Sequence, residues 1–232
     1  MVQGRRAARE GEDPKEIVFA TKPRLGVDLA VRAAGWKVRR APVLGDCAYG
    51  DNTELRDKLH RNGLEYVSSV SPDTTVFCAA TQFIAPQPRG GPGRHSSHPR
   101  PDRDPESIRQ LIARLGESEL QTVAFGDGPD GKPLESRFVF VRVGAAHHRR
   151  AHDGRGRWGN SEEIPPREER LIAEWPKDQP APIDYWISNL PRSTQPERLA
   201  RLARLRWKIE LDYKQLKGEL GLDHYEGRSW LG

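Results

Sequence analysis

The sequence has little of what defines several common protein classes. Its 232 residues include two cysteines, Cys47 and Cys78, and no Cys-x-x-Cys pair, which excludes a disulfide framework and a cysteine-rich zinc site. No run approaches the roughly 18 to 20 consecutive apolar residues that span a bilayer. The first residues contain no apolar stretch of the kind that a signal peptide requires. The sequence therefore predicts a cytoplasmic protein with no membrane partner.

Apolar residues are also scarce, at 35% of the chain, whereas 31% of the residues are charged. Glycine and proline, by contrast, are abundant, with 22 and 19 residues. A chain of this composition buries less apolar surface for its length, so we expect a globular core that carries long irregular segments. The net charge of +5 is compatible with a polyanionic partner but is too small to identify one.

Hydrophobic periodicity predicts alternating helices and strands in the first third of the chain. The expected elements are a helix at 22–34, a buried strand at 41–46, a helix at 53–62 and a strand at 65–70. A strand, a helix and a second strand in this order predict a parallel pair joined by a right-handed crossover. Leu25 and Leu29 fall on one face of the first helix, and Asp51 is expected to cap the second.

The middle and the end of the chain differ in composition and in predicted secondary structure. Residues 85–105 hold six Pro, three Gly and four Arg and are predicted to be a flexible loop. Around a short helix at 107–115, strand patterns at 122–125, 137–143, 169–174 and 185–188 indicate an antiparallel, β-rich region. From 195 to 220 apolar residues recur every three or four positions, which predicts a long helix, and Trp207 is expected in the core.

Asp46 is the first residue that could carry chemistry. It lies where a predicted parallel strand gives way to its loop, and functional groups of open α/β sheets gather at that end of the strands. The alternative is an aspartate that caps a turn.

A charged stripe on the last helix is the second candidate. Arg206, Glu210, Lys214 and Lys217 are spaced so that they lie along one side of the helix. The alternative is a solvated ladder of ion pairs, each worth about 0.2 to 0.5 kcal/mol.

The same stretch resembles the C-terminal catalytic block of bacterial insertion-sequence transposases of the Asp-Asp-Glu superfamily, whose signature is Y-x2-R-x3-E-x6-K. Arg206, Glu210 and Lys217 match the R, E and K of this signature in register, whereas Ala203 stands where the tyrosine would fall. Residues 43–51 are similar to the block that surrounds the second catalytic Asp of that family. The resemblance covers residues 17–232.

The resemblance implies an α/β fold: a partial ribonuclease-H-like domain interrupted by a β-rich insertion. The implied parts are a disordered segment at 1–16, the first part of the core at 17–77, the insertion at 78–184 and the second part of the core at 185–232. It further implies DNA transposition by phosphodiester cleavage and strand transfer. Asp46 and Glu210 would bind Mg²⁺ or Mn²⁺ in a two-ion site, and Arg206 and Lys217 would contact DNA.

The implied partners are double-stranded DNA, at the transposon ends and the target, and further copies of the chain or a full-length transposase, within the nucleoid. The first catalytic Asp of the family and its strands are not found before residue 22. The sequence therefore predicts a copy truncated at both ends and catalytically inactive. The alternative is a non-catalytic DNA-binding remnant or an inhibitor of a full-length transposase.

A second basic segment lies in the insertion. Residues 137–157 contain six Arg and one Asp, and Arg149 and Arg150 are predicted to contact DNA phosphates. The alternative is a solvated loop.

Overall fold

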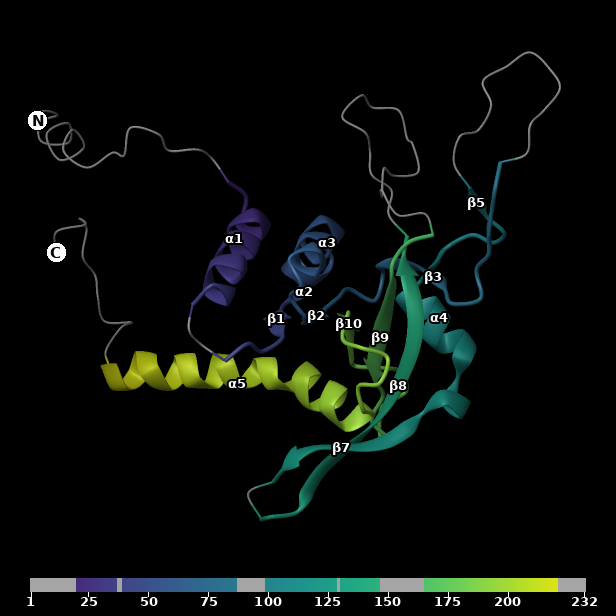
Figure 1. Ribbon diagram of the computed structural model, residues 1–232. Helices are drawn as coiled ribbons and strands as arrows, with labels where there is room; N and C mark the ends of the chain where they lie inside the picture. The colour runs from purple at the N-terminus through teal and green to yellow at the C-terminus, as the bar shows by residue number, and fades with distance from the viewer. Residues whose placement is uncertain (1–19, 37–38, 87–98, 129, 147–164, 221–232) are drawn as a thin grey trace, which may run out of the picture.

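The computed structural model describes residues 20–36, 39–86, 99–128, 130–146 and 165–220, and its centre is one mixed sheet (Figure 1). Along the sheet the strand order is β1-β2-β10-β9-β8-β3-β6, and β7 pairs with β8 beside this path. The strands of this sheet are β1 (Val43–Gly45), β2 (Tyr66–Ser69), β3 (Thr75–Cys78), β6 (Glu106–Ser107), β7 (Gln121–Asp127), β8 (Pro133–Ala145), β9 (Glu168–Glu174) and β10 (Asp184–Ser188). β1 and β2 are parallel, as the strand–helix–strand pattern predicts, and the other pairings are antiparallel.

Helices cover both faces of the sheet, so the described residues form three layers. The helices are α1 (Lys22–Ala34), α2 (Cys47–Gly50), α3 (Thr53–Arg61), α4 (Ile108–Leu115) and α5 (Pro196–Leu220), with a 3₁₀ turn at Glu117–Glu119. Side chains of α1, α3 and α4 share one core with the sheet, whereas those of α5 and β7 share the other. Alternation along the strands divides the cores: Val139 and Leu171 face the first, and Phe138 and Ile172 face the second. The mixed α/β architecture agrees with a partial ribonuclease-H-like fold.

The helix predicted at 22–34 is present, but its buried face was wrongly assigned. Leu25 and Leu29 are 48% and 58% exposed, whereas Val27 is buried, with Ala30 and Ala34 partly buried beside it. The physical reason is that α1 packs against α3, so the side facing that helix is covered instead.

The cap of α3 also differs from the prediction. Asn52, not Asp51, is the N-cap, and its side-chain oxygen accepts a hydrogen bond of 2.9 Å from the backbone N–H of Leu55. Asp51 instead accepts hydrogen bonds from the backbone N–H of Ser71, at 2.8 Å, and from the hydroxyl of Thr74, at 2.7 Å. Asp51 therefore ties the α2 region to the loop that follows β2.

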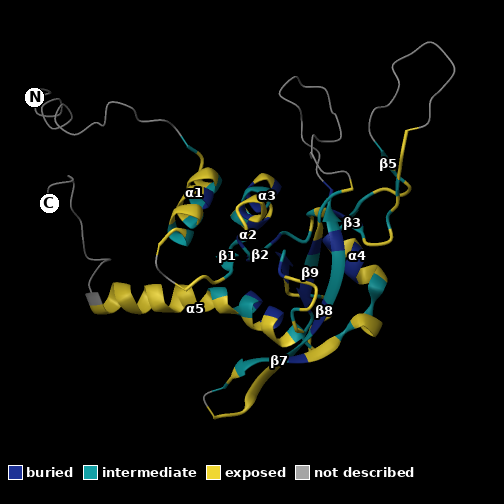
Figure 2. Ribbon diagram, viewed as in Figure 1, coloured by how far each residue is buried: buried dark blue, intermediate teal, exposed yellow. Residues whose placement is uncertain are grey.

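Helix α5 crosses the sheet and then continues past it (Figure 1). Its first half is buried through Leu199, Ala200 and Ala203, but its second half is largely exposed (Figure 2). Trp207 is 58% exposed, so the prediction that it belongs to the core is wrong. The reason is that β1 is the terminal strand of the described sheet on this side, and the helix runs beyond it.

The strands predicted for the insertion belong to the same sheet as the rest of the described chain. β8 and β9 lie between β3 and β10, and the domain boundaries given above stay a prediction. Two short strands, β4 (Phe83–Ile84) and β5 (Arg100–Pro101), pair with each other; part of the predicted flexible loop, 87–98, lies outside the described residues. The predicted disordered segment at 1–16 also lies outside them.

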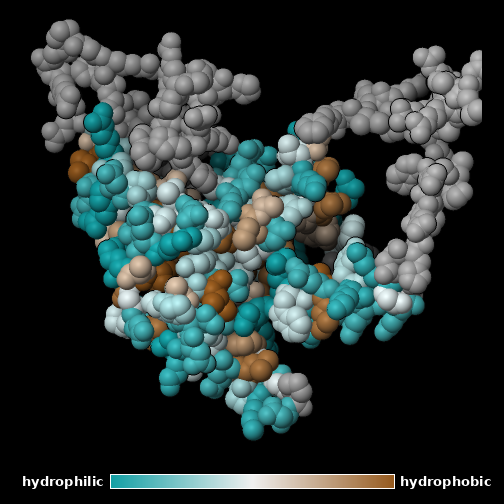
Figure 3. Space-filling view, turned by 180° about the vertical axis from the view of Figure 1, so that it is seen from behind, coloured by the Kyte–Doolittle hydropathy of each residue, from teal (hydrophilic) through white to brown (hydrophobic). Residues whose placement is uncertain are grey.

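The surface seen from behind is mainly hydrophilic, with small hydrophobic patches between the charged side chains (Figure 3). None of the helices in the described ranges is long and apolar enough to cross a bilayer.

Candidate functional site

Asp46 directly follows β1 and begins the short helix α2. Its Oδ1 accepts hydrogen bonds from the backbone N–H groups of Ala48, at 3.0 Å, and Tyr49, at 3.3 Å. The turn-capping role considered above is therefore present in the structure. Both bonds use the same carboxylate oxygen, so capping does not by itself exclude a further role for Asp46.

Two glycines fix the position of this turn against β2. A Cβ atom added at Gly50 would lie 1.8 Å from the backbone oxygen of Ser69, and one added at Gly45 would lie 2.7 Å from the Ser68 hydroxyl oxygen. Cβ atoms in proteins essentially never lie this close to another heavy atom, so a side chain at either position would force the structure to shift. The backbone on both sides of Asp46 therefore packs directly on the neighbouring strand.

A buried arginine binds the backbone of the same turn. Arg56 of α3 is 1% exposed, and its guanidinium donates a hydrogen bond to the backbone oxygen of Gly50. The guanidinium also binds Glu169 of β9 through two hydrogen bonds, Nε to Oε1 at 2.9 Å and Nη2 to Oε2 at 3.3 Å. The α2 turn is thus linked through Arg56 to a strand far along the chain.

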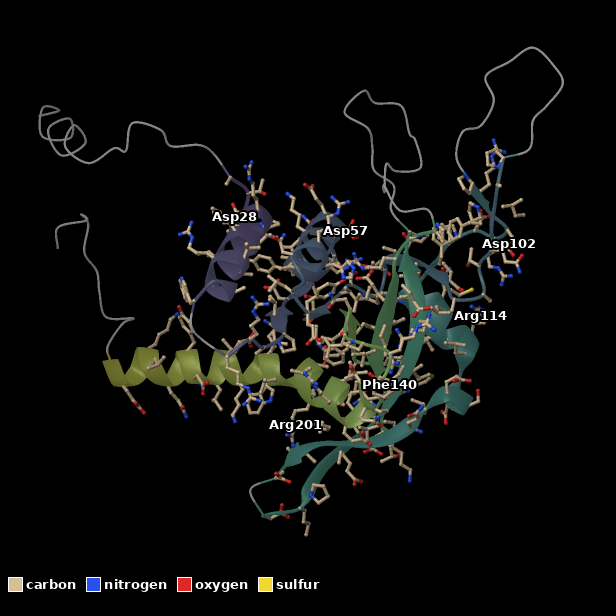
Figure 4. The ribbon with its side chains drawn as sticks, viewed as in Figure 1. Asp28, Asp57, Asp102, Arg114, Phe140 and Arg201 are labelled. Carbon is tan, nitrogen blue, oxygen red and sulfur yellow. The ribbon has the colours of Figure 1, made fainter. Side chains whose placement is uncertain are left out.

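Tyr66 and Arg167 complete this buried network. The Tyr66 hydroxyl donates to Glu169, and Arg167 donates to the Tyr66 oxygen at 2.9 Å and to Asp57 of α3 at 3.0 Å (Figure 4). Burial alone would raise the pKa of Glu169, but Arg56, Arg167 and the Tyr66 hydroxyl together outweigh burial and hold this pKa below its ordinary value. Glu169 is therefore an ionised carboxylate in the core.

Helix α5 contacts β1 and carries Arg206 and Glu210. The two side chains form an ion pair, with Arg206 Nη1 and Glu210 Oε1 2.8 Å apart. Burial, together with the charges of Asp51 and Asp46, raises the pKa of the Cys47 thiol, and the positive charge of Arg206 opposes that rise. Arg206 therefore lies near the turn that begins at Asp46.

The other predicted DNA-contacting residues are placed differently. Lys217 lies seven residues beyond Glu210, about 10 Å further along α5, and its Nζ is 5.9 Å from the centre of the Tyr213 ring. Arg149 and Arg150 lie outside the described residues.

Three charged residues that sequence reasoning did not select lie on the α5 face of the sheet. Glu174 ends β9 and is paired across the sheet with Asp184, which begins β10. Glu174 is 1% exposed, and Arg204 of α5 places its Nε 3.1 Å from Glu174 Oε2. This contact is not aligned as a hydrogen bond, and both Glu174 oxygens lack a hydrogen-bond partner among the described residues. The available signal was a glutamate that directly follows the apolar residues 171–173 of β9.

Burial acts on both carboxyls of this pair. It raises the pKa of Glu174 and of Asp184. The side chain of Ser136 and then the charge of Arg204 oppose the rise at Glu174, and Arg204 opposes it at Asp184. At Glu174 the proximity of Asp184 adds to the rise.

The raised pKa of Glu174 gives a pH-dependent prediction. Its folded-state pKa exceeds its unfolded value, so its contribution to stability is fully present below the unfolded pKa and is lost as the pH rises through the folded one. Glu174→Gln removes this titration. Its melting temperature relative to the parent should therefore increase from acidic to neutral pH, as measured by circular dichroism.

Glu119→Gln, at an exposed site, is the control and should show no such trend. A Glu174→Gln variant that becomes less stable than the parent at neutral pH would show that the ion pair with Arg204 outweighs the cost of burial.

The described residues do not form a complete metal centre. No three His, Cys, Asp or Glu side chains in the described ranges are grouped so that they could hold a metal ion. Asp46 and Glu210 carry the hard oxygen atoms that suit Mg²⁺, but Asp46 caps α2 and Glu210 is paired with Arg206. Neither carboxylate therefore belongs to a group of donors that could hold a metal ion in the described part of the chain.

Comparison with known proteins gives one family. The model of the family described as DDE superfamily endonuclease matches residues 2–132, a range that includes Asp46 and its turn. No curated protein matches the chain.

Proposed function

Because the chain belongs to the DDE superfamily of endonucleases, we propose that it acts on DNA as a transposase-type nuclease, with Asp46 and Glu210 as its metal-binding carboxylates. Nucleases of this superfamily generally use divalent metal ions. The two carboxylates would contribute to a site for Mg²⁺ or Mn²⁺ that a third donor completes. The reaction proposed is phosphodiester cleavage and strand transfer during DNA transposition.

The observation that carries this proposal is the meeting of two distant segments at one end of β1. Asp46 directly follows that strand, and Arg206, which is paired with Glu210, approaches the turn of Asp46 from α5. The matched family supports a nuclease role for the first segment. The charged stripe of α5 supports such a role for the second.

The charge of α5 favours DNA as the partner. The helix carries seven Lys and Arg against four Asp and Glu, and Arg206 and Lys217 are proposed to contact the DNA. A guanidinium can bind phosphate oxygens through two parallel hydrogen bonds, whereas a lysine acts as a point charge.

A second candidate is a DNA-binding protein that does not cleave, or that pairs with a full-length transposase and inhibits it. Among the described residues no three ligand-type side chains are grouped, and Glu210 is paired with Arg206; both observations favour this candidate. Binding of DNA phosphates needs basic groups and no metal, so it would survive the loss of Asp46.

Nicking of supercoiled DNA by the full chain, in Mg²⁺ and in Mn²⁺, tests the proposal. Asp46→Asn and Glu210→Gln are each expected to lower the nicking rate about 100-fold or more, since a bound metal supplies several kcal/mol of charge stabilisation. Asp212→Asn, an exposed carboxylate on the same helix, is the matched control and should nick like the parent.

Nicking that persists in both variants would contradict the roles given to Asp46 and Glu210. A folded parent protein that binds DNA without nicking it would favour the second candidate.

A further inference from the structure

Three arginines gather on the α5 face of the sheet, away from Asp46. Arg142 of β8 and Arg170 of β9 are direct cross-strand partners. They share a strand face with Phe140 and Ile172, which belong to the core under α5. Arg192, from the loop between β10 and α5, joins them.

One carboxylate, that of Glu168, is paired with two of the three guanidinium groups. Glu168 Oε1 lies 3.0 Å from Arg142 Nη1, and Glu168 Oε2 lies 2.5 Å from Arg192 Nη2. Arg170 has no carboxylate of its own in the described chain; its Nη2 donates to the backbone oxygen of Arg192 at 3.1 Å. The group therefore carries a local excess of positive charge.

Two of the three arginines are partly desolvated, whereas Arg192 is 76% exposed. Arg142 is 20% exposed, and Arg170 is also partly buried. Burial, and then the charges of Arg142 and Arg192, lower the pKa of Arg170, while Glu168 opposes them. Like charges held together out of water are costly, and an anion bound between them would relieve that cost.

Other charged residues lie on the same face of the sheet and on α5. In β9, Arg170 is four residues from Glu174, which corresponds to about 13 Å along the strand. Arg201 is exposed on the first turns of α5 (Figure 4), and the exposed Arg198 of the same helix is paired with Glu65. The helix that carries Arg206 therefore supplies further arginines.

We propose that Arg142, Arg170 and Arg192 form a second DNA contact site, which binds backbone phosphates of a duplex. The choice of DNA as the ligand rests on the proposed function. The planar guanidinium groups supply paired N–H donors that match phosphate oxygens. Glu168 holds the arginines in place in the free protein and competes with the phosphate for them.

The test measures binding of a fluorescently labelled duplex to the full chain by anisotropy, in EDTA, over a series of salt concentrations. Arg142→Gln and Arg170→Gln are each expected to weaken binding about 3- to 10-fold and to lower the slope of log affinity against log salt by about 1. Glu168→Gln is expected to strengthen binding, because it removes the competing carboxylate. A purely structural role for the arginines would not produce that gain.

Arg114→Gln is the matched control. Arg114 is exposed on α4, on the other face of the sheet, and is likewise paired with a glutamate, Glu106 (Figure 4). It should bind DNA like the parent. Should a glutamine variant fail to fold, Arg142→Lys and Arg170→Lys keep the charge but lose the paired donors, and they should also weaken binding.

Unchanged duplex affinity in the Arg142 and Arg170 variants, or weaker binding by Glu168→Gln, would overturn the proposal. A second outcome would also overturn it: the arginine variants lose the binding of inorganic phosphate but keep the duplex affinity of the parent. The group would then bind a free anion and not DNA. Because EDTA prevents cleavage, a failure here is distinct from a failure of the nicking experiment, which tests Asp46 and Glu210.

Discussion

Replacing Arg56 by Met is expected to lower the free energy of unfolding by about 3–5 kcal/mol, because it leaves the Glu169 carboxylate buried without its main counter-charge. Both side chains are 1% exposed, so water cannot replace the lost partner. The hydrogen bond from Arg56 to Gly50 is lost as well. Urea denaturation of parent and variant measures the effect.

The double variant Arg56→Met with Glu169→Leu is expected to recover part of this loss, because a buried ion pair replaced by apolar side chains no longer leaves an unpaired charge. Lys132→Gln, at an exposed ion pair with Asp130, is the surface control and should change stability by less than about 0.5 kcal/mol. A double variant that is no more stable than Arg56→Met would argue against the unpaired carboxylate as the cause.

Gly50→Ala is expected to destabilise the protein by about 3 kcal/mol, the upper part of the usual cost of overpacking. The added Cβ would lie 1.8 Å from the backbone oxygen of Ser69, and a backbone atom of β2 cannot move aside as a flexible side chain can. The α2 turn must then shift, and Asp46 with it. Thermal unfolding measures the first effect, and the nicking or DNA-binding experiment reports on the second.

Gly218→Ala is the matched control on α5. A Cβ at Gly218 would meet nothing within 4 Å, and alanine favours a helix more than glycine does, so this variant should be more stable by up to about 1 kcal/mol. A Gly50→Ala variant as stable as the parent would contradict the close packing of the α2 turn on β2.

Much of the fold follows from local signals in the sequence. The proline in the first turn of α1, the apolar spacing of α5 and the run that ends at Asp46 predict elements that the structure contains. The parallel pairing of β1 and β2 follows from the helix between them, because parallel strands need such a crossover. The family resemblance, drawn from both ends of the chain, agrees with the matched family.

The sequence predicts less well what depends on contacts between distant segments. The apolar stripe of α5 looks continuous, yet only its first half lies over the described sheet, so Trp207 is exposed. The choice of Asn52 over Asp51 as a cap depends on where α2 ends and on the partners that Ser71 and Thr74 offer to Asp51. Periodicity carries no information about either.

The residues of the candidate site likewise divide into those that the sequence reveals and those that only the structure reveals. Asp46, Arg206 and Glu210 could be selected from their spacing and their resemblance to a signature. Arg56 and Glu169 could not, because they are 113 positions apart and neither belongs to a motif. Arg56 of α3 meets Glu169 of β9 only when β9 has joined the sheet.

That separation has a consequence for the synthesis of the protein. At about 5 to 20 residues per second, a ribosome needs roughly 6 to 23 seconds to proceed from Arg56 to Glu169. During this interval the nascent chain already holds the α2 turn but lacks the carboxylate that neutralises Arg56. The turn that begins at Asp46 therefore acquires its full support only after most of the chain has been translated.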